Sequence, residues 1–176
     1  MTNKITVENR HAYTYGNSDA DLWVIQPVDE RYLNTIDLEL QEINNLTDNA
    51  DFFLIAVIIS DWNSELSPWQ AAPVFGKESF GDGADATLSF IINSLIPTLK
   101  KLYHVTSKKH YVMAGYSLAG LFALWSGFRT ELFSGIAAVS PSVWFPRFVE
   151  FTKNSSVKAR HIYLSLGDKE AHTKNP

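Results

Sequence analysis

The chain has 176 residues, a formal net charge of −4 and no cysteine. This length suits one domain, and 45% hydrophobic residues are enough to build a core. The acidic balance excludes a nucleic-acid partner, because a phosphate-binding surface needs an excess of Lys and Arg. The missing thiols exclude disulfides and a cysteine nucleophile. No apolar run reaches the ~20 residues that span a bilayer, and Met1–Lys4 lack the character of a signal peptide. We therefore expect a soluble, cytoplasmic protein without a membrane partner.

Short apolar runs alternate with helical patterns along the chain, which is typical of a parallel sheet with crossover helices. The run 52–59 (FFLIAVII) is apolar on both faces, as expected for a central strand. Pro97 lies inside a helical pattern and should kink that helix or end its regular part. The predicted strands cover 21–27, 52–59, 111–114, 135–139 and 161–166, and the predicted helices cover 31–45, 84–101 and 118–129.

This order predicts the α/β class, as a three-layer α/β/α sandwich with a mostly parallel sheet. In such sheets the binding crevice lies at the carboxyl ends of the strands. Residues 60–83 form a long irregular connection, and loops of this length usually serve as active-site walls or lids. The short basic stretch Lys108-Lys109-His110 is interpreted as a solvated loop.

The sequence Gly115-Tyr116-Ser117-Leu118-Ala119-Gly120 stands directly between a predicted strand and a predicted helix. A serine on such a sharp turn has an exposed hydroxyl and is typical of a nucleophile. Residues 115 and 119 must be small because the backbones of strand and helix approach each other there. The alternative is that Ser117 only caps the helix, but a cap requires neither Gly115 nor Ala119. The N–H of Leu118 would be one oxyanion donor.

Several runs around this motif resemble a known family. They are AGYSLAGLFALW, LFSGIAAVSPSVWFP, LSLGDKE and the earlier stretch AVIISDWNSELSPWQAAPVFGKESFGDGAD. Together they are similar to the esterase branch of the α/β-hydrolase superfamily, which includes the enterochelin esterases and the esterase-D-like enzymes. The resemblance extends over residues 22–176. It implies the α/β-hydrolase fold and a Ser–acid–His triad in that chain order, with Ser117 as nucleophile.

The resemblance places the triad acid after the last predicted strand. Asp168 is the first choice and Glu170 the alternative, while Asp168 could also be a simple turn residue. A second oxyanion donor is expected from the loop after the 52–59 strand, near Asp61 or Trp62.

Four aromatic residues are candidates for the substrate pocket. Tyr116 should pack near its mouth. For the three tryptophans, lining the pocket and packing in the core or a lid are equally open alternatives. They are Trp62, Trp69 and Trp144.

The family places the catalytic histidine on a loop after one further strand, and none of the five histidines here has that position. His11 lies in the N-terminal segment, and three others lie on the wrong side of the sheet (His104, His110 and His161). His172 is on the correct side but adjoins the predicted acid. We expect residues 1–176 to be one C-terminally incomplete α/β-hydrolase domain without its last helix and strand, exposing an apolar sheet edge. The other interpretation is a chain that has lost catalysis.

The sequence thus predicts a serine hydrolase that cleaves a small carboxylic ester through an acyl-enzyme on Ser117. No HExxH, G-x-G-x-x-G or P-loop motif occurs, so no metal site and no cofactor are expected. Two alternatives use the same scaffold: a non-catalytic binding module without a base, and an acyltransferase with an acceptor other than water. The sequence carries no signal for an oligomeric state.

Overall fold

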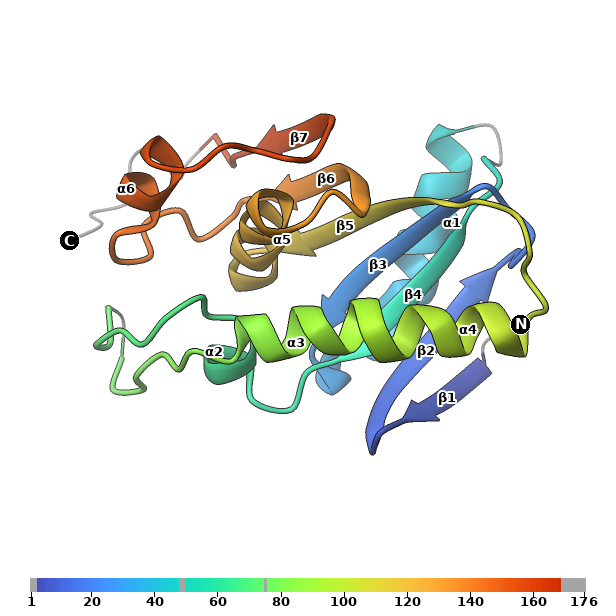
Figure 1. Cartoon of the computed structure of the whole chain (residues 1–176), viewed down its shortest axis with the longest axis horizontal. Helices are drawn as coiled ribbons and strands as arrows, with labels where there is room; N and C mark the ends of the chain where they lie inside the picture. Colours follow the sequence, from blue (N-terminus) through green and yellow to red (C-terminus); the bar gives the residue numbers. More distant parts are fainter. Residues whose placement is uncertain (1–2, 48–49, 75, 169–176) are drawn as a thin grey trace.

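A single mixed sheet of seven strands organises the part of the chain that the computed structural model describes, residues 3–47, 50–74 and 76–168 (Figure 1). The strand order is β1-β2-β4-β3-β5-β6-β7. β2 pairs antiparallel with β1 and β4, whereas β4, β3, β5, β6 and β7 run parallel. The strands are β1 (Asn3–Val7), β2 (Arg10–Gly16), β3 (Leu22–Val28), β4 (Phe53–Ile58), β5 (His110–Tyr116), β6 (Phe133–Val139) and β7 (His161–Ser165).

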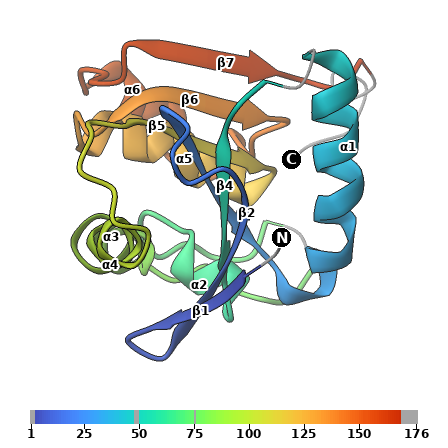
Figure 2. The same ribbon diagram turned by 90° about the vertical axis from the view of Figure 1, so that its right-hand side faces the viewer.

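Helices cover both faces of the sheet, as the three-layer prediction requires. Figure 2 shows α1 (Ile36–Leu46) on one side, and α3 (Ala84–Phe90), α4 (Ile96–Leu102) and α5 (Leu118–Arg129) on the other. The larger hydrophobic cluster lies between the sheet and α3, α4 and α5. A smaller one lies under α1 and contains Ile36 and alternate residues of β4. Every side chain of β4 is buried, which confirms the predicted central strand.

The N-terminal hairpin β1–β2 was not expected from the sequence. Its two-residue turn consists of Glu8 and Asn9, both with positive φ (49° and 65°). This backbone matches the twist of a tight hairpin, but the turn contains none of the glycine that normally signals one. The remaining five strands agree with the predicted ones to within a few residues.

The predicted helix over 84–101 is one continuous helical run, α3–η2–α4, in which η2 (Ile91–Leu95) is π-helical. Pro97 is the second residue after this segment. Because proline has no N–H and its ring collides with the carbonyl four residues earlier, a widened turn before it lets the helix continue. The helix predicted over 31–45 starts as a 3₁₀ turn, η1 (Glu30–Thr35), before α1. Two short helices were not predicted: α2 (Trp62–Glu65) and α6 (Phe148–Lys153).

The interpretation of Lys108-Lys109-His110 as a solvated loop is wrong for Lys109. Its side chain is buried, and its Nζ donates a hydrogen bond to the carbonyl of Asp19 (2.6 Å). The long apolar stem of a lysine tolerates such burial when the ammonium finds an acceptor. His110 is already the first residue of β5.

β7 is an edge strand of the described sheet, and its apolar side chains are exposed on both faces. Ile162, Tyr163 and Leu164 are 45%, 60% and 52% exposed. The expected apolar sheet edge is therefore present. Among the described helices, none is both long and apolar enough to cross a membrane.

Candidate active site

Ser117 occupies the sharp turn from β5 into α5 with φ 56° and ψ −120°. Positive φ at a residue other than glycine costs about 1–3 kcal/mol and persists only where the surroundings impose it. Here three backbone hydrogen bonds impose it. The Ser117 N–H donates to the Val139 carbonyl (3.1 Å), and the Ser117 carbonyl accepts from the N–H groups of Leu121 and Ser142 (both 3.0 Å). The turn has the backbone of a nucleophile elbow.

The small residues around Ser117 are required by close backbone contact, as the sequence predicted. A Cβ at Gly115 would lie 2.4 Å from the carbonyl carbon and oxygen of Ala119. A Cβ at Gly120 would lie 3.0 Å from the Gly115 carbonyl oxygen and 3.1 Å from Pro141. Strand β5, helix α5 and the loop after β6 therefore converge beside Ser117. A helix cap alone would not produce this packing.

Ser142 is a neighbour of Ser117 that was not predicted as a site residue. Its Oγ lies 3.3 Å from the Oγ of Ser117, and its side chain is buried. Its backbone N–H also donates a hydrogen bond to the Ser117 carbonyl. Ser142 therefore contacts Ser117 through both its side chain and its backbone. Ser140-Pro141-Ser142 follow β6 at the carboxyl end of the strand, where ligands bind in such sheets, but the sequence alone does not show which hydroxyl lies beside Ser117.

Ser117 lies in an open pocket of about 950 Å³ at the carboxyl ends of β3, β4 and β5. This is the edge where parallel sheets bind ligands. Two predicted substrate-binding residues, Tyr116 and Trp62, line the pocket together with Asp61. Ala119 of α5 also lines the pocket. Lining residues that were not predicted come from β3 and the segment after it and from the 60–83 connection: Gln26, Pro27, Val28, Asp29, Arg31, Tyr32, Thr35, Ser60, Asn63 and Glu78.

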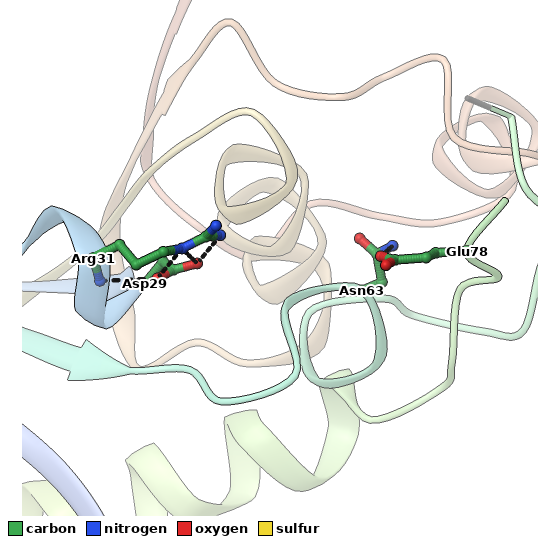
Figure 3. Close-up of polar contacts among 4 residues, drawn as sticks. All are labelled: Asp29, Arg31, Asn63 and Glu78. Carbon is green, nitrogen blue, oxygen red and sulfur yellow. Dashed lines mark hydrogen bonds and ion pairs between the residues drawn. The ribbon is translucent and has the colours of Figure 1, made fainter. Parts of the chain in front are cut away.

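The segment after β3 is the pocket wall nearest to Ser117 in the sheet topology, because β3 lies directly beside β5, the strand that leads into Ser117. It carries an ion pair: Arg31 Nε donates to both carboxylate oxygens of Asp29 (3.0 and 3.1 Å), and its terminal nitrogen adds a third contact (2.5 Å) (Figure 3). The hydrogen bonds from the Arg31 side chain, followed by the one from its backbone N–H, lower the pKa of Asp29. The pair is therefore ionised at neutral pH.

The side chain of Glu65 fixes the loop after β4 through hydrogen bonds to its backbone. Its Oε1 accepts hydrogen bonds from the N–H groups of Ser60 (3.0 Å) and Asp61 (2.9 Å). Its Oε2 pairs with the guanidinium of Arg10 on β2, which also stacks on the Phe90 ring (4.9 Å). The Asp61 N–H, one of the two predicted second oxyanion donors, is therefore occupied by a carboxylate in this structure. The Trp62 alternative stays a prediction.

The other two tryptophans predicted as pocket candidates, Trp69 and Trp144, lie outside the pocket of Ser117. Trp69 donates its indole N–H to the Pro146 carbonyl (2.9 Å) and packs against Phe145 and Phe151. Trp144 packs near Phe80, with ring centroids 6.1 Å apart and ring planes tilted by 58°. Neither residue lines the pocket of Ser117. These contacts favour packing rather than substrate binding for both.

Asp168 is exposed and follows β7, at the same edge of the parallel sheet as Ser117. Its role as triad acid stays a prediction, and both Glu170 and His172 lie outside the described residues. Of the described histidines, none lines the pocket; His110 and His161 begin their strands at the opposite edge. Within the described ranges, no three His, Asp or Glu side chains come close enough to hold a metal ion.

Comparison with known proteins identifies the family. The model of the family described as "Putative esterase" matches residues 41–175, more than half of the chain. The chain belongs to this esterase family. A siderophore triacetylfusarinine C esterase of Aspergillus fumigatus is 33% identical to it over 115 residues, which are 60% of this chain and 38% of the relative. The chain thus spans well under half of that relative's length.

Solved esterase structures share the fold. The siderophore hydrolase EstA from Aspergillus nidulans superposes with a TM-score of 0.71 and 20% identity, over 97% of this chain and 69% of EstA. An IroE-like serine hydrolase from Shewanella oneidensis gives a TM-score of 0.69 and 18% identity, over 88% of this chain and 55% of that protein. The esterase chain described here therefore has the α/β-hydrolase-type fold that its sequence predicted.

The contact between Gly115 and Ala119 predicts that Gly115→Ala is destabilising. The new methyl group would overlap backbone, which cannot turn aside, so we expect the free energy of unfolding to fall by about 1–3 kcal/mol. Gly127→Ala in helix α5, which follows the turn, is the matched control. There the methyl group would meet the side chain of Ile136 at 3.0 Å, and the change should stay below about 1 kcal/mol. Equal losses in urea unfolding would contradict the predicted backbone collision.

Glu65→Ala should destabilise the loop after β4. It removes the acceptor of two backbone N–H groups and leaves the partly buried Arg10 without its counter-charge, so a loss of about 2–4 kcal/mol in unfolding free energy is expected. Glu65→Gln keeps one acceptor oxygen and should lose less. Glu131→Ala, an exposed glutamate before β6, serves as control. If Glu65→Ala and Glu131→Ala unfold at the same urea concentration, Glu65 does not hold this loop.

Proposed function

We propose that the chain is the nucleophile-bearing part of a serine carboxylic-ester hydrolase that works through an acyl-enzyme on Ser117. The observation that carries this proposal is the strained backbone of Ser117 at the mouth of the pocket, fixed by β5, α5 and the loop after β6. A capping serine has no need of positive φ, whereas a nucleophile elbow depends on it. Membership of the esterase family supports the same chemistry.

In the proposed reaction the Ser117 oxygen attacks the ester carbonyl while a base takes its proton. The tetrahedral intermediate then expels the alcohol, and water releases the acid from the acyl-serine. The family resemblance supplies the base as a histidine and proposes Asp168 as its partner. Ser142, 3.3 Å from the Ser117 hydroxyl, can restrain the orientation of that hydroxyl before attack.

The oxyanion is proposed to bind two backbone N–H groups. One is that of Leu118, the first residue of α5, whose N–H has no acceptor within its own helix. For the second, the loop after β3 is the better candidate, since β3 is the direct neighbour of β5 and this loop commonly supplies the donor in α/β hydrolases. Occupation of the Asp61 N–H by Glu65 supports this revision of the prediction from sequence.

The substrate is proposed to be a small-molecule ester. The relatives named above are siderophore esterases and hydrolases, which makes ester-linked siderophores one candidate class. An open pocket of about 950 Å³ has room for a substrate of that kind or for part of one.

Ser117→Ala tests the nucleophile. In the complete natural protein, we expect hydrolysis of p-nitrophenyl acetate to fall at least about a thousand-fold, because no other group replaces the attacking oxygen. Ser126→Ala is the matched control: it removes a buried hydroxyl from the same helix, where the Ser126 Oγ donates to the Ala123 carbonyl. Turnover retained by Ser117→Ala would disprove the nucleophile. Absence of turnover in the natural protein as well would favour a non-catalytic binding module.

A further inference from the structure

The charged side chains of the pocket are mostly acidic. Of the described residues that line it, three are carboxylates (Asp29, Asp61 and Glu78) and only Arg31 is a cation. Asp29 and Arg31 follow β3, whereas Asp61 and Glu78 follow β4. Figure 3 shows Asp29, Arg31 and Glu78. The electrostatic potential at a ligand in this pocket therefore depends on which of these charges are paired with an opposite charge.

The positive charge of Arg31 is already compensated. Three contacts of 2.5–3.1 Å tie its guanidinium to Asp29. An exposed pair of this kind adds little to stability, but each charge largely cancels the other at the distance of a ligand. Arg31 consequently offers an incoming anion much less attraction than an unpaired arginine would.

The other two carboxylates have neutral partners. Asp61 accepts a hydrogen bond from the Ser64 N–H (3.1 Å), which caps α2, and Glu78 accepts from the side-chain amide of Asn63 (3.5 Å) (Figure 3). Hydrogen bonds to neutral donors stabilise a carboxylate without removing its charge. The nearby Glu65–Arg10 pair adds no net charge behind this loop. Two negative charges therefore remain in the pocket.

We propose that this pocket selects esters that are neutral or cationic near the scissile bond and disfavours anionic esters. The inference rests on the proposed ester hydrolysis at Ser117 and adds the charge class of the substrate. Uncompensated charges in a binding pocket reduce both the encounter rate and the binding of a ligand of the same sign, even when the charges are exposed to water. The overall net charge of −4 acts in the same direction.

The test compares three thioesters of similar shape in the complete natural protein. They are acetylthiocholine (cationic), S-(3,3-dimethylbutyl) thioacetate (neutral) and 2-(acetylthio)ethanesulfonate (anionic). We take the charge of the ligand to lie about 7 Å from each of the two carboxylates, with water between them. At 10 mM salt, kcat/KM should then fall about five-fold from the cationic to the neutral ester and about five-fold again from the neutral to the anionic ester. Each step should shrink to about two-fold at 0.15 M.

Two substitutions assign the effect to the pocket. Glu78→Gln and Asp61→Asn remove a charge each but keep a hydrogen-bonding oxygen, and asparagine still caps a helix. Together they should bring the cation-to-anion ratio of kcat/KM close to one. Glu150→Gln, an exposed glutamate of α6 outside this pocket, should leave the ratio unchanged.

If the anionic ester is turned over as fast as the neutral one, the charge inference fails but the proposed ester hydrolysis stands. The same holds if the two substitutions together leave the cation-to-anion ratio of kcat/KM unchanged. If no thioester is hydrolysed faster than by Ser117→Ala, the proposed function fails and this inference falls with it. Turnover in the order cation, neutral, anion, with the salt dependence given above, supports both.

Discussion

The close approach of strand β5 and helix α5 is the constraint on which the rest of the site depends. The backbones meet at Gly115 and Ala119, where a Cβ on residue 115 would overlap the Ala119 carbonyl, and Ser117 has positive φ in the turn between them. Strain of this size survives because hydrogen bonds from α5 and from the loop after β6 hold the turn on both sides. The result is a hydroxyl aimed at the pocket from a rigid support.

The topology then determines what surrounds that hydroxyl. Because β3, β4 and β5 are parallel neighbours, the loops at their carboxyl ends meet above Ser117. One loop carries the Asp29–Arg31 pair, and the other is fixed by Glu65 through two backbone N–H groups. Glu65 in turn reaches Arg10 on the N-terminal hairpin. An antiparallel hairpin at one side of the sheet is thus linked to the wall of the pocket through one ion pair.

The sequence predicted the parts of the structure that depend on local pattern. Five strands, the helix α5, the elbow and the need for a small residue at 115 all follow from apolar runs and from the spacing around Ser117. Lys109 and the β1–β2 hairpin escaped prediction because a buried lysine depends on a distant carbonyl, and the Glu8-Asn9 turn lacks glycine.

The walls of the pocket were harder to predict because they depend on strand order. The sequence shows that β4 follows β3, but not that β3 lies between β4 and β5. The second oxyanion donor was expected near Asp61 or Trp62; the Asp61 N–H is engaged by Glu65, and the Trp62 alternative stays a prediction. Trp69 and Trp144 could be assigned only once their packing partners were known.

Covalent labelling distinguishes an activated nucleophile at Ser117 from an ordinary serine. The complete natural protein would be treated with a fluorophosphonate, digested with trypsin and analysed by mass spectrometry. The peptide from His110 to Arg129 contains both Ser117 and the buried Ser126, so fragmentation can distinguish them. We predict one phosphonyl group on Ser117 and none on Ser126. An unlabelled protein, or a label on any other serine, would contradict the assignment.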